Sequence, residues 1–167
     1  AYMNEEKFDT ALYYFQVSKE LAEEIGNMSG VAYSLGNIAN IYMADEDYEK
    51  ALNIYNEVRD LSEEDNNKLG LSLSYVNISI VYTELADLSD NNNQKKNYFA
   101  LALENAQNSL KYAEEIESLT HMGYAYFQLI ESFIVTGDYV NSLEYAEKYI
   151  EAKDSVFNIQ RIKENER

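Results

Sequence analysis

The stretch Ala51-Leu52-Asn53-Ile54-Tyr55, with Tyr48 three residues before the alanine, belongs to a phrase that the chain repeats four times. An aromatic residue, a small residue three positions later and an adjacent leucine stand at 8, 11 and 12, at 48, 51 and 52, at 99, 102 and 103, and at 139, 142 and 143. The leucine therefore advances by 40, 51 and 40 residues. Self-similarity of this kind predicts a stacked repeat array rather than a domain with one closed core.

A second column of aromatic residues gives the same register. It holds Tyr2, Tyr42, Tyr82 and Phe133, which are 40, 40 and 51 residues apart. The additional residues of the longer step therefore lie within the third repeat. We predict repeats at about 1–27, 28–67, 68–118 and 119–157, an extra helical hairpin insertion near 85–98, and the start of a C-terminal helical linker at 158–167.

Each repeat has the pattern of two amphipathic helices. In the second repeat, apolar residues at 35, 38, 39 and 42 follow the i, i+3, i+4, i+7 spacing of one helix face. We expect helices at about 30–44 and 48–64, then at 68–88 and 94–117, and at 119–136 and 138–154, the last two joined by Gly137 as a left-handed cap. In the shortened first repeat only residues 1–3 belong to the first helix, and the second runs from about 5 to 25. The fold class expected is all-α, with about three and a half helical hairpins and a C-terminal helix.

The composition limits the classes of function. The chain has 30 acidic and 13 basic residues, a net charge of −17 spread along its length, so it disfavours nucleic acid and anionic membrane surfaces. Without cysteine it forms no disulfide, and this leaves reducing and oxidising compartments both open. No apolar run approaches the roughly 18 residues of a membrane span. The chain begins inside a repeat, and we expect it to be part of a longer protein.

The repeated motifs resemble the tetratricopeptide repeat. The resemblance rests on Leu35-x2-Ile38-Ala39-x2-Tyr42 with Ala51-x3-Tyr55, and on three more instances: Tyr75-x2-Ile78-Ser79-x2-Tyr82, Tyr126-x2-Leu129-Ile130-x2-Phe133 and Ala11-x3-Phe15. It implies a right-handed superhelix of antiparallel helix pairs and a non-catalytic role in binding proteins or peptides. The chain departs from the family in lacking proline, in its longer period and in the bulky Ile130.

The C-terminal phrase Lys153-Asp154-Ser155-Val156-Phe157 resembles the end of the repeat array in Bacteroidetes-type sensors. That resemblance implies an extracytoplasmic, periplasmic sensory region of a membrane-anchored two-component-like protein, with a kinase or DNA-binding output outside this chain. The period of 40 also resembles the cytoplasmic peptide-pheromone regulators of Gram-positive bacteria. A cytoplasmic scaffold or pheromone-responsive regulator is therefore the alternative. In both interpretations the partner is a protein or peptide.

Three side-chain amides, Asn37, Asn77 and Gln128, occupy one column of the first helices. In the family these helices line a concave groove, so the resemblance places the column in it, where a ladder of amides can bond an extended peptide backbone. The absence of Lys and Arg argues against a carboxylate clamp. The other residues expected in the groove are Tyr33, Gly36, Asn40, Met43, Leu73, Val76, Ile80, Thr83, Glu84, Tyr124, Phe127, Glu131 and Ile134.

No residue pattern indicates catalysis or a metal. His121 is the only histidine and has no co-ligand, and the acidic pairs at 23–24, 63–64 and 114–115 recur from repeat to repeat, as an active site does not. The alternating polar residues near 87–93 lack the glycine and the terminal glutamate of a calcium loop. We therefore expect no enzyme activity, no metal and no cofactor. Because the ends of a repeat array leave apolar faces uncovered, we also expect end-to-end packing or a homodimer through the shortened first repeat.

Overall fold

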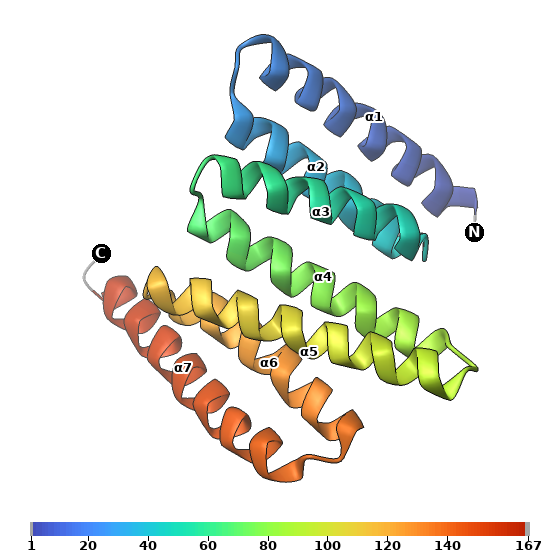
Figure 1. Ribbon diagram of the computed structural model, residues 1–167. Helices are drawn as coiled ribbons and strands as arrows, with labels where there is room; N and C mark the ends of the chain where they lie inside the picture. Colours follow the sequence, from blue (N-terminus) through green and yellow to red (C-terminus); the bar gives the residue numbers. More distant parts are fainter. Residues whose placement is uncertain (1, 166–167) are drawn as a thin grey trace. The chain divides into compact units, whose positions relative to one another are not determined.

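The computed structural model describes residues 2–165, which form seven α-helices joined by short turns, with no strand in this range (Figure 1). This confirms the predicted all-α fold. The helices are α1 (Tyr2–Glu24), α2 (Met28–Ala44), α3 (Tyr48–Glu64), α4 (Lys68–Leu88), α5 (Asn92–Glu115), α6 (Leu119–Thr136) and α7 (Tyr139–Asn165).

The chain divides between Ser74 and Tyr75, inside α4, into two compact units. In the first unit, α2 packs against both α1 and α3; in the second, α6 packs against both α5 and α7. In each unit, therefore, the first helix of one repeat lies between two second helices. The division of the sequence into four repeats stays a prediction.

Two helix boundaries differ from those expected. A break near residue 4 was predicted, and the structure has α1 unbroken from Tyr2 to Glu24. The second helix of the fourth repeat, expected to end near 154, continues as α7 to Asn165. Neither segment contains the glycine or proline that ends a helix, so local propensity allows both to continue. Near 85–98, α4 ends at Leu88 and α5 begins at Asn92, so the added residues lengthen these two helices.

Residues with positive φ end five of the helices. Gly137 adopts φ 79° at the end of α6, which confirms the predicted left-handed cap. Gly26 has the same conformation after α1, whereas Glu46, Asn66 and Glu117 adopt φ values of 61°, 51° and 51° in equivalent turns. A side chain in this region costs free energy that glycine does not, so the two glutamates are points of local strain.

Small residues set the spacing of helices at the repeat junctions of the first unit. A Cβ atom built on Gly30 of α2 would lie 3.1 Å from the Cβ of Ala22 in α1. At Gly70 in α4 it would lie 3.0 Å from the Cβ of Ser62 and would overlap the Ser62 hydroxyl oxygen. Because no side chain fits between them, each second helix approaches the following first helix at backbone distance.

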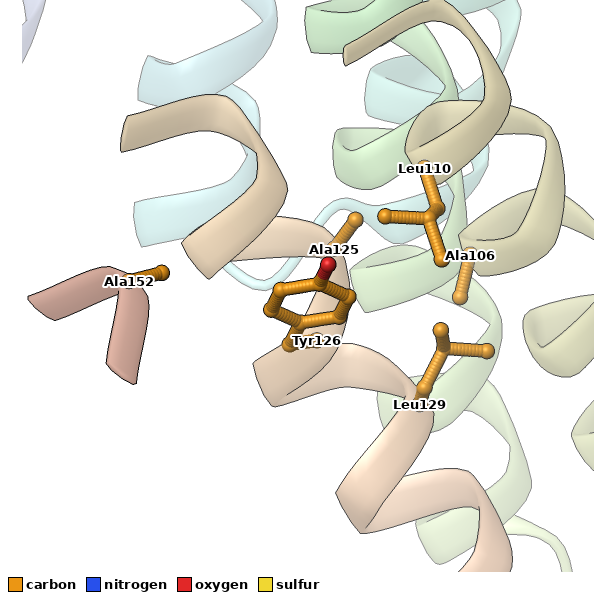
Figure 2. Close-up of a cluster of buried hydrophobic side chains, with 6 residues drawn as sticks. All are labelled: Ala106, Leu110, Ala125, Tyr126, Leu129 and Ala152. Carbon is orange, nitrogen blue, oxygen red and sulfur yellow. The ribbon is translucent and has the colours of Figure 1, made fainter. Parts of the chain in front are cut away.

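Each unit has its own apolar core. Figure 2 shows the core of the second unit, where the Tyr126 ring lies between Ala152 of α7 and two residues of α5, Ala106 and Leu110; Ala125 and Leu129 complete it. The core of the first unit contains Ala22, Val31, Leu35 and Val58. Within the described residues, no helix combines the length and apolar character needed to cross a membrane.

Candidate ligand-binding site

On α2, the residues expected in the groove differ in their hydrogen bonding. Tyr33 is 70% exposed, and the half-buried Asn37 donates its Nδ2 hydrogen to the Tyr33 carbonyl oxygen at 2.8 Å. Asn40 is exposed and accepts a 2.6 Å hydrogen bond from the hydroxyl of Tyr55. Burial raises the pKa of Tyr55 to about 12, so this hydroxyl stays a donor at neutral pH. Met43 is half-buried on the same helix.

On α4, Asn77 and Ile80 are half-buried and Glu84 is exposed. On α6, Glu131 is half-buried, whereas Gln128 is only 8% exposed. The Gln128 amide therefore lies among core side chains, less accessible than those of Asn37 and Asn77. The amide ladder stays a prediction.

Two aromatic residues of α6 that were predicted to lie in the groove are exposed. Tyr124 is 52% exposed and Phe127 is 46% exposed. The Phe127 ring packs at 54° to that of Tyr149 in α7, with centroids 6.2 Å apart, and Tyr124 meets His121 edge to face at 5.7 Å. We call Tyr124, Phe127 and Tyr149 the aromatic face. Its three rings give a large contact area and lose little side-chain entropy on binding.

A cavity of about 160 Å³ adjoins the aromatic face. Gly123 opens it, since a Cβ atom at this position would point at Tyr149, whose Cε2 is 4.0 Å away. Most of the lining side chains are apolar or aromatic, and Thr120 and Lys153 are the polar aliphatic residues among them. The lining consists of Leu119, Thr120, Gly123 and Tyr124 from α6 and Tyr149, Lys153 and Val156 from α7.

Lys153 is the only charged residue that lines this cavity. Its Nζ atom lies 5.8 Å from the centroid of the Tyr149 ring, a cation–π distance. Its neighbours three and four residues away along α7 are Tyr149, Ile150, Val156 and Phe157, none of which carries a carboxylate. Lys153 accordingly forms no ion pair among the described residues. Five other cations do: Lys19, Lys50, Arg59, Lys95 and Lys148.

The first turn of α6 is capped differently from those of α2 and α4. At α2 the side chain of Asn27, and at α4 that of Asn67, accepts a hydrogen bond from the third backbone N–H of the helix, each at 3.0 Å. At α6 the equivalent residue is Ser118, which makes no side-chain cap bond and instead places its hydroxyl oxygen 2.6 Å from Nδ1 of His121. Burial of the His121 ring lowers its pKa.

The sequence interpretation did not include Gly123, Tyr149 or Lys153 in the site. A signal for Lys153 was present in the repeat register. Lys153 follows Ala22, Ser62 and Ala113 at steps of 40, 51 and 40 residues, so it replaces a small residue of every earlier repeat.

A second cavity, of about 190 Å³, lies in the first unit between α1 and α2. Two carboxylates, Asp9 and Asp45, contribute to its lining, together with Tyr42 and apolar side chains. In the part of the chain that the structure describes, no three His, Cys, Asp or Glu side chains gather in a way that could hold a metal ion.

Comparison with known proteins identifies the repeat in one part of the chain. Residues 29–90 match the tetratricopeptide repeat family, and this range covers less than half of the sequence. It spans α2, α3 and α4 apart from the first residue of α2. No curated protein matches the chain. The match confirms that the chain contains a tetratricopeptide repeat.

Proposed function

We propose that this tetratricopeptide-repeat chain is a non-catalytic module that binds a segment of a protein or peptide on its first helices. The observation that carries the proposal is the exposure of Tyr124 and Phe127 beside the cavity of about 160 Å³. Exposed rings next to a concave apolar surface are typical of binding sites. They also lie on α6, a first helix of the kind that the family uses for ligands, and this supports the assignment.

The chemical groups of the site fit binding better than catalysis. They are aromatic rings, the hydroxyl groups of Thr120 and two tyrosines, and one ammonium group, which supply contact area and orientation. Ser118 and His121 are hydrogen-bonded to each other, but among the described residues no hydrogen bond from a third side chain orients the imidazole, as a catalytic triad requires. We therefore assign no reaction to this site.

A sensory role in a larger bacterial signalling protein is the finer proposal, with an extracytoplasmic location. The phrase from Lys153 to Phe157 supports it, and so does α7, which continues without a break from the binding site to Asn165. A ligand that bound one arrangement of α6 and α7 more tightly than another would shift the population of states along this helix. A cytoplasmic scaffold or a pheromone-responsive regulator would use the same site.

The test is a selection from a random peptide display library, followed by calorimetric titration of the selected peptide in solution. We expect Phe127→Ser to weaken binding by about tenfold or more, since it removes a large apolar contact. Tyr13→Ser is the matched control, because Tyr13 is 61% exposed and forms an aromatic pair with Tyr14 on α1. Failure to select any peptide, or greater sensitivity to Tyr13→Ser than to Phe127→Ser, would contradict the proposed function.

A further inference from the structure

The cavity between α6 and α7 differs from the surfaces that pack against the following helix at the two repeat junctions of the first unit. At those junctions a small residue of one helix contacts a glycine of the following helix. Ala22 contacts Gly30, and Ser62 contacts Gly70. The equivalent residue of α7 is Lys153. A lysine in this position is much larger than alanine or serine, so this part of α7 differs from the surfaces that Gly30 and Gly70 approach in the first unit.

The size and the walls of the cavity define one part of its occupant. A dry protein cavity of about 150 Å³ holds a benzene molecule, and the cavity here measures about 160 Å³. Two tyrosine rings, Leu119 and Val156 form most of its wall. This combination suits one large apolar side chain, aromatic or branched.

Lys153 indicates a second chemical group of the occupant, a negative charge. It has no carboxylate partner among the described residues, although the chain has more than twice as many acidic as basic residues. None of its neighbours three and four positions away on α7 carries a carboxylate. A ligand carboxylate beside the apolar group would supply the missing charge at the rim of the cavity.

The exposed surface of α6 continues past the cavity. Phe127 and Ile134 are both 46% exposed and lie further along the helix, on the side of Tyr124. A ligand that covers them extends beyond the cavity along α6. We assign the carboxylate to an acidic side chain of such a segment, and a carboxylate at the end of the ligand chain is an outcome of the test.

We infer that the α6–α7 cavity is an anchor subsite, which takes a large apolar side chain adjacent to an aspartate or glutamate of the bound segment. The inference rests on the proposed function and specifies the class of ligand. The apolar side chain enters between Tyr124 and Tyr149, and the neighbouring carboxylate meets Lys153.

The experiment titrates blocked tetrapeptides into the ¹⁵N-labelled chain and follows the backbone amides of Thr120 and Gly123 by NMR. The peptides are acetyl-Gly-Phe-Asp-Gly-amide, its Asn and Lys analogues in place of Asp, and acetyl-Gly-Ala-Asp-Gly-amide. We expect the Phe-Asp peptide to bind about two- to fivefold more tightly than the Phe-Asn peptide, as for an exposed ion pair. The Phe-Lys peptide should be weaker again, and loss of the ring should weaken binding by about tenfold.

Two variants test the assignment to this cavity. Lys153→Gln should remove the preference for Asp over Asn and leave the preference for Phe over Ala. Gly123→Leu should abolish binding by filling the cavity, and the helix should keep its stability because leucine is the better helix former. Asn53→Leu is the control: Asn53 is exposed on the second helix α3, outside the predicted groove, so the variant should bind the tetrapeptides as the wild type does.

Equal binding of the Asp, Asn and Lys peptides, or binding by Gly123→Leu as strong as by the wild type, would overturn the inference. Tighter binding of acetyl-Gly-Phe with a free carboxyl end than of the Phe-Asp peptide would also overturn it, by identifying a chain end as the source of the charge. If a library-selected peptide binds the wild type and Gly123→Leu equally, the inference fails while the proposed function stands. If the library yields no peptide and the tetrapeptides cause no shifts, both fail.

Discussion

The hydroxyl oxygen of Ser118 and Nδ1 of His121 lie 2.6 Å apart, across the first turn of α6. These two residues occupy the register positions that hold asparagine and glycine at the start of α2 and α4. The exchange moves the capping side chain from the backbone N–H groups to an imidazole. The start of α6 thereby acquires an ionisable imidazole, which the other two junctions lack.

This contact predicts an acid sensitivity of the folded state. Because burial lowers the pKa of His121 below its ordinary value of 6.5, the unfolded chain takes up this proton at a higher pH than the folded chain does. The stabilising contribution of the neutral ring is complete above about pH 6.5 and is lost as the pH falls below it. Urea unfolding followed by circular dichroism should show a larger loss of unfolding free energy between about pH 7 and pH 5 for the wild type than for His121→Gln. If the free energy of unfolding of the wild type and that of His121→Gln changed with pH in the same way, His121 would not be the source of the acid sensitivity.

The close approach of Gly70 to Ser62 predicts opposite effects of one substitution at two helical glycines. Gly70→Ala should destabilise the fold by roughly 1–3 kcal/mol, because its Cβ would overlap the Ser62 hydroxyl oxygen. Gly36→Ala should stabilise it by about 0.5–1 kcal/mol, since the added Cβ meets no heavy atom within 4 Å and alanine favours the helix. Thermal denaturation of both variants checks the pair. A stabilised Gly70→Ala would show that α3 and α4 are further apart than described.

The left-handed conformation of Glu117 predicts a stabilising glycine substitution. At φ 51° a side chain strains the backbone, so Glu117→Gly should raise the free energy of unfolding by about 1 kcal/mol. The matched control is Glu104→Gly, an exposed position inside α5, where glycine should lower it by about 0.5–1 kcal/mol. Chemical denaturation of the two variants measures both effects. Equal destabilisation by both would contradict the assigned backbone conformation.

The amide column of the first helices leads to a prediction about ligand affinity. Replacing Asn37 and Asn77 together with alanine should weaken a selected peptide by about tenfold, as expected for the loss of two hydrogen bonds, and should leave the helical content unchanged. Replacing Asn53 and Asn97, which are exposed on the second helices α3 and α5, should leave affinity unchanged. Calorimetric titration of the selected peptide into each double variant measures the two affinities. If both double variants bind as the wild type does, the amides contribute no recognition.

The sequence predicted the features that the repeats share. The recurring columns located most of the helices, and Gly137 could be assigned as a cap because its conformation follows from a local rule. The continuity of α1 and α7 was harder to predict, because the sequence contains no residue that either forces or forbids a break there. Amphipathic periodicity alone does not fix where such a helix ends.

The site depends on features that differ between repeats, and this explains why part of it was missed. Tyr124 and Phe127 were expected from their place on a first helix, and the structure exposes both. Lys153 departs from the repeat register in the sequence, but it and Gly123 are assigned to one cavity only when α6 and α7 are packed together, because the cavity forms from the space between them. The burial of Gln128 likewise depends on side-chain packing, which a column in the sequence cannot give.

The most direct test of the central claim is NMR mapping of a library-selected peptide onto the ¹⁵N-labelled chain. If the chain binds a protein segment on its first helices, the largest shift changes will lie on the exposed face of α6 around Tyr124 and Phe127, and they will disappear in Phe127→Ser. Shift changes confined to α1, α3 and α5, or equal in the wild type and Phe127→Ser, would contradict the account.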